Sequence, residues 1–88
     1  MKNTKVEGRV MPHSIEGEQS VLGCVLIDQD AGYNVLSSLS GDDFYVEAHK
    51  IIFNAMYDVY KRNSPVDLIT LTDELEKNDL LESVGGLE

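Results

Sequence analysis

The feature that most constrains the fold is a stretch of apolar residues between positions 44 and 62 that repeats with the period of an α-helix. The stripe consists of Phe44, Ala48, Ile51, Ile52, Ala55, Met56 and Val59. A helix with such a stripe buries it against other elements of a globular domain. The basic pair Lys61 and Arg62 suits the negative end of a helix, and Pro65 follows closely. The sequence therefore predicts a long central helix over about residues 44–62.

Two helices are predicted upstream of this central helix. Ser14 is a suitable N-cap, and Glu16 and Glu18 place negative charge in the first turn, where the helix dipole favours it. Apolar residues then recur at steps of three and four, which predicts a helix over residues 15–28. Residues 28–32 are interpreted as a break in the pattern, followed by a short helix over residues 33–39. Gly23 lies inside the first helix, where it either permits the close approach of another helix or is simply tolerated.

One further helix is predicted downstream. Asp67 is a second clear N-cap, and Leu71 and Leu75 share one face of the helix that follows, which ends near residues 77–78. The pair at residues 85–86 is a turn signal. No alternation with period two persists anywhere in the chain. The predicted fold class is therefore all-α, a small orthogonal bundle of about four to five helices.

The helical spacing also predicts which side chains build the core and which contact a partner. The expected core residues are Leu22, Leu26, Phe44, Ile51, Ile52, Met56, Leu71 and Leu75. A row of aromatic side chains runs beside the apolar stripe of the central helix, and such rows occur both in cores and in interfaces. We expect part of this row to meet a partner, and its candidate residues are Tyr45, Phe53, Tyr57 and Tyr60.

Charge limits the classes of partner. The formal net charge of the 88-residue chain is −9, although residues 1–13 carry a net charge of +2, so that the remainder carries −11. A nucleic-acid backbone is bound by clustered Lys and Arg, so no direct nucleic-acid binding is expected from this part of the chain. No apolar run is long enough to span a membrane, and residues 1–11, predicted to be a disordered arm, lack the apolar segment of a secretory signal. A cytoplasmic protein is expected.

The sequence carries no recognisable motif of catalysis or cofactor binding. The chain has no phosphate-binding loop of the form G-x-x-x-x-G-K-[ST] and no nucleophile elbow. A single cysteine, Cys24, allows no intrachain disulfide and is interpreted as a buried apolar side chain. His13 and His49 are not spaced as metal ligands, and His49 is interpreted as a packing residue of the central helix. We therefore expect no catalytic residues, no metal, no cofactor and no enzymatic activity of this chain itself.

Four short segments resemble a known family in the same order along the chain. Residues 12–23 (PHSIEGEQSVLG) are similar to the string P-x-S-I-E-A-E-Q-S-V-L-G at the start of the N-terminal domain of the bacterial replicative DNA helicase, the DnaB family. Residues 43–45 (DFY), followed by His49, Ile52 and Phe53, resemble that family's D-F-Y…H…I-F helix. Residues 65–71 (PVDLITL) and 84–87 (VGGL) resemble two further segments of the same domain. Gly17 departs from the family's usual Ala.

The resemblance implies that residues 12–88 are a helical collar domain, incomplete at its C-terminal end. In that family the domains pair, and three pairs form the collar of a hexameric ring that serves ring assembly and primase docking. The expected partners are therefore other copies of the domain, primase and a helicase loader. ATP and Mg²⁺ belong to a separate RecA-like motor domain, of which this chain contains nothing. The alternative is a free-standing acidic helical regulator or decoy that binds replication proteins.

Overall fold

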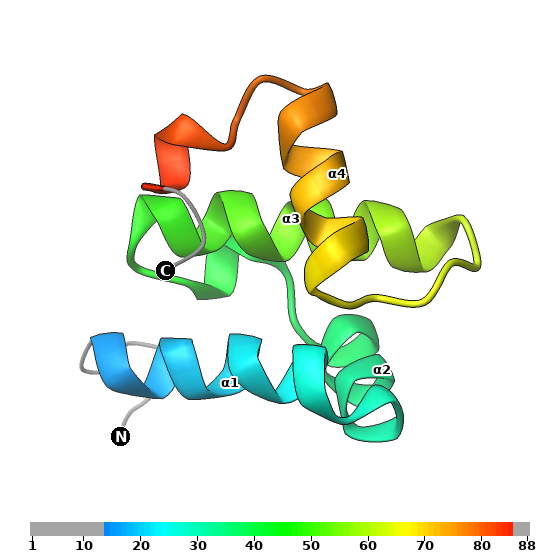
Figure 1. Ribbon diagram of the computed structural model, residues 1–88. Helices are drawn as coiled ribbons and strands as arrows, with labels where there is room; N and C mark the ends of the chain where they lie inside the picture. Colours follow the sequence, from blue (N-terminus) through cyan, green and yellow to red (C-terminus); the bar gives the residue numbers. More distant parts are fainter. Residues whose placement is uncertain (1–13, 86–88) are drawn as a thin grey trace.

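Helix α3 (Glu47–Lys61) lies at the centre of the molecule, and the other elements pack around it (Figure 1). The computed structural model describes residues 14–85. The remaining elements are α1 (Ile15–Ile27), α2 (Gln29–Ser38), the 3₁₀ turn η1 (Gly41–Asp43), α4 (Leu68–Lys77) and the 3₁₀ turn η2 (Glu82–Val84). Helix α1 runs alongside α3, and α4 crosses α3 steeply (Figure 1). The described residues form helices and turns without any strand, which confirms the predicted all-α bundle.

The predicted break after the first helix is much shorter than expected. Asp28 alone separates α1 from α2, and its Oδ1 atom accepts a hydrogen bond from the N–H of Ala31 at 3.2 Å. This cap starts α2 at Gln29, four residues before the predicted start at residue 33. Because an Asp can end one helix and cap the next, the acidic residues that suggested a loop here belong to a tight corner between two helices.

Two glycines in this region behave differently. A Cβ atom added to Gly32 would lie 2.9 Å from the Cα of Val25, so the absence of a side chain allows α2 to pack closely on α1. A Cβ atom added to Gly23 would have no neighbour within 4 Å. Of the two alternatives for Gly23, simple tolerance is therefore the correct one, and Gly32 is the glycine that the packing requires.

Helix α3 begins three residues later than the predicted start at Phe44. Phe44, Tyr45 and Val46 precede it, and the N-cap Val46 makes no side-chain capping bond. An apolar N-cap cannot satisfy the free backbone N–H groups at a helix start, so another residue must do so. That residue is Glu18 of α1, whose contacts are described below.

Helix α4 begins as the sequence predicts. The Asp67 carboxylate accepts from the backbone N–H of Thr70 at 2.9 Å, and the Thr70 hydroxyl oxygen accepts from the backbone N–H of Asp67 at 2.9 Å. This reciprocal pair is a capping box. Beyond α4, the backbone turns at Asp79 (φ 62°) and again at Gly85 (φ 78°), where the left-handed conformation favours glycine.

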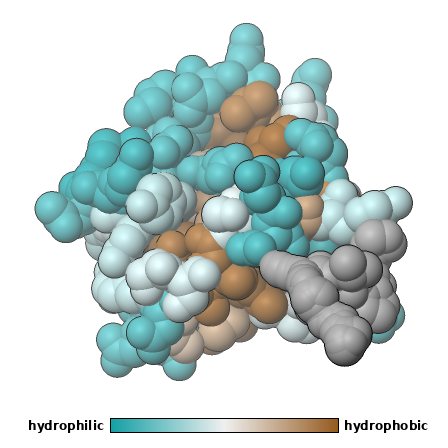
Figure 2. All heavy atoms as spheres, turned by 180° about the vertical axis from the view of Figure 1, so that it is seen from behind, coloured by the Kyte–Doolittle hydropathy of each residue, from teal (hydrophilic) through white to brown (hydrophobic). Residues whose placement is uncertain are grey.

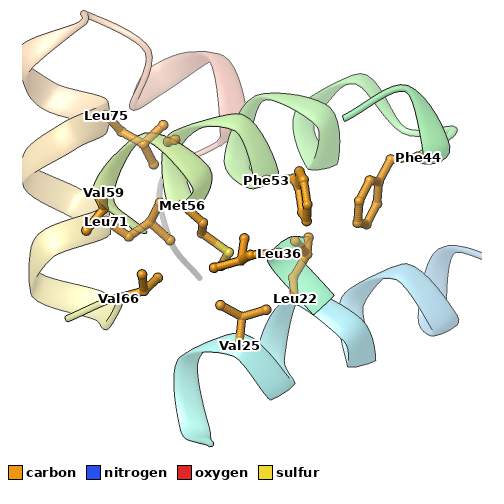
Figure 3. Packing of buried hydrophobic residues seen from close by; sticks show 11 residues of the cluster. Leu22, Val25, Leu36, Phe44, Phe53, Met56, Val59, Val66, Leu71 and Leu75 are labelled. Atoms are coloured by element: carbon orange, nitrogen blue, oxygen red, sulfur yellow. The ribbon is translucent and has the colours of Figure 1, made fainter. Parts of the chain in front are cut away.

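The core lies between α3 and the helices on either side of it (Figure 3). Its buried members are Leu22, Val25, Leu36, Phe44, Phe53, Ala55, Met56, Val59, Val66, Leu71 and Leu75. Five of the eight expected core residues are in this cluster: Leu22, Phe44, Met56, Leu71 and Leu75. The other three, Leu26, Ile51 and Ile52, are half-buried and pack against it.

Some expectations fall outside the described residues. The predicted disordered arm at residues 1–11, the start of the predicted domain at residue 12 and the side chain of His13 lie before residue 14, and Gly86 lies after residue 85. Within the described part, none of the helices combines the length and the apolar character that crossing a membrane requires.

Candidate interaction surface and buried polar contacts

Residues 14–85 contain no group of three or more His, Cys, Asp or Glu side chains placed to hold a metal ion. Cys24 is half-buried on α1. His49 is buried, as its interpretation as a packing residue required, but it also makes a polar contact that the sequence did not reveal. The features of interest are therefore a group of aromatic side chains at the surface and two glutamates, the half-buried Glu18 and the buried Glu74.

The aromatic row predicted as an interface divides into exposed and buried members. Tyr45 is 61% exposed and lies before the start of α3, and Tyr57 is 38% exposed. Tyr60 is half-buried. Phe53 is only 1% exposed, and its ring centroid lies 5.2 Å from that of Phe44. Because α3 is covered by α1 and α2 as well as by α4, its buried arc is wider than one stripe, and Phe53 belongs to the core, where a partner cannot reach it.

Tyr57 and Tyr60 form a cluster with Tyr33 of α2, which is not a member of the predicted aromatic row. The ring centroid of Tyr60 lies 5.2 Å from that of Tyr33 and 6.1 Å from that of Tyr57. The Nζ atom of Lys61 lies 5.3 Å from the centroid of the Tyr57 ring, a cation–π arrangement. We call Tyr33, Tyr57 and Tyr60 the tyrosine cluster. Tyr33 lies on α2 and is distant in sequence from Tyr57 and Tyr60 on α3, so only the tertiary structure could show that the three rings meet.

Glu18 is the residue that completes the start of α3. Its Oε2 atom accepts from the backbone N–H of Tyr45 at 2.7 Å, and its Oε1 atom accepts from the backbone N–H of Val46 at 3.3 Å. Oε1 also lies 2.7 Å from Nδ1 of His49. An ionised carboxylate can only accept, so Nδ1 of His49 carries the hydrogen in this contact. One side chain of α1 thus satisfies three donors at the start of the central helix.

The pKa of Glu18 reflects this position. Burial acts to raise the pKa of the carboxyl, but the hydrogen bonds from Tyr45, His49 and Val46 act in the opposite direction. The net result is a pKa below the ordinary value, so the carboxylate is the stable form at neutral pH.

A second glutamate, the buried Glu74, joins α4 to the end of α3. Its Oε1 atom lies 2.8 Å from NH2 of Arg62 and 3.4 Å from Nζ of Lys77. Its Oε2 atom accepts from the side-chain amide of Asn78 at 3.1 Å. The hydrogen bond from Arg62 is the main reason that the pKa of Glu74 lies below its ordinary value, despite the opposing effect of burial.

The described surface is mostly acidic. Residues 14–85 hold 14 Asp and Glu against four Lys and Arg. Seen from behind, the molecule presents hydrophilic side chains around an apolar area (Figure 2). Several large apolar side chains are exposed, among them Ile27 (87%) and Ile69 (73%). The excess of acidic side chains repels phosphate backbones.

Comparison with known proteins gives a consistent result. The family model described as "DnaB-like helicase N terminal domain" matches residues 10–88. The chain is 47% identical over 79 residues to the replicative DNA helicase DnaB of Geobacillus stearothermophilus, and the aligned residues make up 90% of this chain and 17% of that protein. It is 44% identical over 80 residues to the replicative DNA helicase DnaB of Pasteurella multocida, and the aligned residues make up 91% of this chain and 17% of that protein. The chain thus spans about a sixth of the length of these relatives.

A solved structure agrees with these sequence matches. The chain is similar to the crystal structure of the N-terminal domain of DnaB helicase from Mycobacterium tuberculosis, with a TM-score of 0.80 and 41% sequence identity. The match covers 85% of this chain and 54% of that one. The resemblance carried by the four sequence segments is therefore confirmed, and the arrangement of the helices agrees with it.

Proposed function

Because this chain belongs to the family of DnaB-like helicase N-terminal domains, we propose that it acts as a non-catalytic interaction domain of a replicative DNA helicase. Its proposed roles are assembly of the collar of a hexameric ring and docking of primase, in the cytoplasm, within a primosome. A helicase loader is a further proposed partner. The observation that carries the proposal is the family match over residues 10–88.

The surface of the domain supports a role in protein contacts. The tyrosine cluster is partly exposed, and Tyr side chains are enriched in the cores of protein interfaces. Tyr45 is also exposed at the start of α3. We therefore propose Tyr45, Tyr57 and Tyr60, joined by Tyr33, as the side chains with which the domain meets a partner.

The negative charge of the domain supports the proposal that another domain binds DNA and ATP. An excess of ten acidic side chains over residues 14–85 repels a phosphate chain. We propose that ATP hydrolysis, Mg²⁺ binding and the holding of DNA belong to a separate motor domain. Fluorescence anisotropy with a labelled oligothymidylate should then show no saturable binding of the 88-residue chain below about micromolar concentration at physiological salt.

A chimera tests the proposal directly. The matched residues of the Geobacillus stearothermophilus helicase are replaced by this chain, since the two are 47% identical over 79 residues. Sedimentation should show that the chimera assembles into the same ring as the parent helicase, and calorimetry should show that it binds primase. A matched pair of variants within the chimera, Tyr57→Ala in the tyrosine cluster and Ile69→Ala on α4, then locates the contact.

Each outcome has a clear meaning. Loss of binding in Tyr57→Ala, with Ile69→Ala unaffected, assigns the tyrosine cluster to the interface. Loss in Ile69→Ala alone moves the interface to α4 and refutes that assignment. A chimera that is well folded but neither assembles nor binds primase refutes the proposed function itself.

A further inference from the structure

The contacts of Glu18 link α1 to the start of α3, in addition to the apolar packing of α1 and α2 on α3. Helix α1 packs chiefly on α2, whereas η1, α4 and η2 pack on α3. The hydrogen bonds of Glu18 cross between these parts and link residues 27 to 31 positions apart. Two of the three bonds, those from Val46 and His49, are half-buried, so water replaces them poorly when they break.

The position of Glu18 makes this contact sensitive to protonation of the carboxylate. The first turn of α3 carries the partial positive charge of free backbone N–H groups, and the Glu18 carboxylate supplies the compensating negative charge there. A protonated carboxyl has no charge and less capacity to accept hydrogen bonds than a carboxylate. Protonation of Glu18 therefore weakens the cap of α3.

Glu74 differs from Glu18 because its partners are exposed cations. The side chains of Arg62 and Lys77, which bind Glu74, are 48% and 63% exposed. Arg62 is the C-cap of α3 and Lys77 is the last residue of α4, where the helix dipole favours cations. Protonation of Glu74 leaves these two cations solvated and well placed, so it disturbs the α3–α4 contact less.

The other charged groups around His49 do not replace Glu18. The elements that pack on α3, together with the first turns of α3 itself, also carry Glu16, Asp30, Asp42, Asp43, Glu47, Lys50, Asp73, Glu76 and Glu82. All of these are exposed or half-exposed to water. The one charged partner within ion-pair distance of His49 among the described residues is Glu18.

From this geometry we propose that Glu18 and His49 form an acid-sensitive latch, in which protonation of the carboxylate frees the α1–α2 pair from α3 while α4 stays packed on α3. The domain then passes through a partly open state on acidification instead of unfolding in one step. The buried face of α3 that contains Phe53 becomes accessible in that state.

The test follows methyl signals of the 88-residue chain by NMR while the pH is lowered from about 7 to about 3, which spans the titration of carboxylates. Leu22 and Val25 report on α1, and Leu71 and Leu75 report on α4. We expect the α1 methyls to leave their native positions at a higher pH than the α4 methyls. Simultaneous loss of all four signals, or earlier loss of the α4 signals, overturns the proposal.

Three variants sharpen the test. Glu18→Gln removes the charge, as protonation does, so the α1 methyls should be displaced already at neutral pH and lose their separate acid transition, whereas the matched variant Glu74→Gln should keep the wild-type order. His49→Phe removes the donor that lies 2.7 Å from Oε1 and that helps to lower the pKa of Glu18, so it should move the α1 transition to higher pH and widen the gap between the two transitions. An unchanged gap in His49→Phe, or loss of the order in Glu74→Gln alone, contradicts the latch. Because the wild-type order and the His49→Phe gap are independent readouts, they decide the question even if Glu18→Gln does not fold.

Discussion

Helix α3 is held differently on its two flanks. On the α4 flank, Glu74 binds Arg62 and Lys77, which are 12 and three residues away in sequence. On the α1 flank, Glu18 binds two backbone N–H groups and an imidazole that are 27 to 31 residues away. The first contact uses permanent, solvent-exposed cations, and the second uses the start of a helix. The comparison teaches that two glutamates largely shielded from water can make contacts of different strength and different response to pH, depending on what they bind.

The apolar contacts should show no such difference between the flanks. Leu36 of α2 is 1% exposed and Leu75 of α4 is 0% exposed, so replacing either by Ala should lower the free energy of unfolding by about 2–5 kcal/mol. Urea denaturation measures both, with the 52% exposed Leu68→Ala as the matched control, expected within about 0.5 kcal/mol of wild type. A loss in only one of the two buried variants would mean that one flank is loosely packed.

Replacing Glu18 or Glu74 should have unequal effects on stability at neutral pH. Glu18→Gln weakens three hydrogen bonds to a charged acceptor, and we expect it to lower the free energy of unfolding by about 2–3 kcal/mol. Glu74→Gln leaves its two cations in water, so about 1 kcal/mol is expected. Urea denaturation at neutral pH compares them, and Glu16→Gln, an exposed position on α1, is the control. Equal losses in the free energy of unfolding for Glu18→Gln and Glu74→Gln would mean that the two glutamates stabilise their flanks of α3 to the same extent.

The pH dependence of stability follows from the two lowered pKa values. Folding lowers the pKa of both Glu18 and Glu74, so their contribution to stability is fully present above the ordinary carboxyl pKa of about 4.3 and is lost as the pH falls through the lower folded-state values. Urea midpoints of the wild type should therefore fall on acidification. The double variant Glu18→Gln/Glu74→Gln should have a shallower slope in the same range. A wild-type protein that gains stability on acidification would contradict this assignment.

The smallest predicted effect concerns the two glycines of the α1–α2 pair. Gly23→Ala places a methyl group in open space within a helix, and we expect a gain of about 1 kcal/mol in the free energy of unfolding. Gly32→Ala, the matched variant, forces a Cβ to within 2.9 Å of the Val25 backbone, so we expect a net loss of about 1–3 kcal/mol. Thermal melting distinguishes the two, and a gain in both would mean that α1 and α2 can separate at no cost.

Much of the fold could be predicted because its signals are local. The stripe of α3, the Asp67 cap of α4 and the basic residues at the end of α3 are all visible within a few positions of one another. The start of α2 was missed because Asp28 caps one helix directly after ending another. The start of α3 was missed because its cap comes from a different helix, which no local pattern encodes.

The candidate surface was predictable only in part for the same reason. The period of α3 selected Tyr57 and Tyr60, but the same period also selected Phe53, which is buried because α3 is covered from more than one side. Tyr33 joins the cluster from α2, and Glu18 meets His49 from α1. These pairings depend on how the helices pack, so the sequence could offer the residues but not their partners.

The distant cap of α3 also has a consequence for the order of events in folding. During synthesis, Glu18 leaves the ribosome before His49, so the acceptor for the start of α3 already exists when that helix emerges. The later turns of α3 can propagate by local hydrogen bonds. Its first turn becomes stable only after α1 has docked, because Glu18 and Tyr45 are 27 positions apart in sequence. Mutations at Glu18 should therefore change mainly the unfolding rate and little of the folding rate, the kinetic signature of a contact made after the transition state.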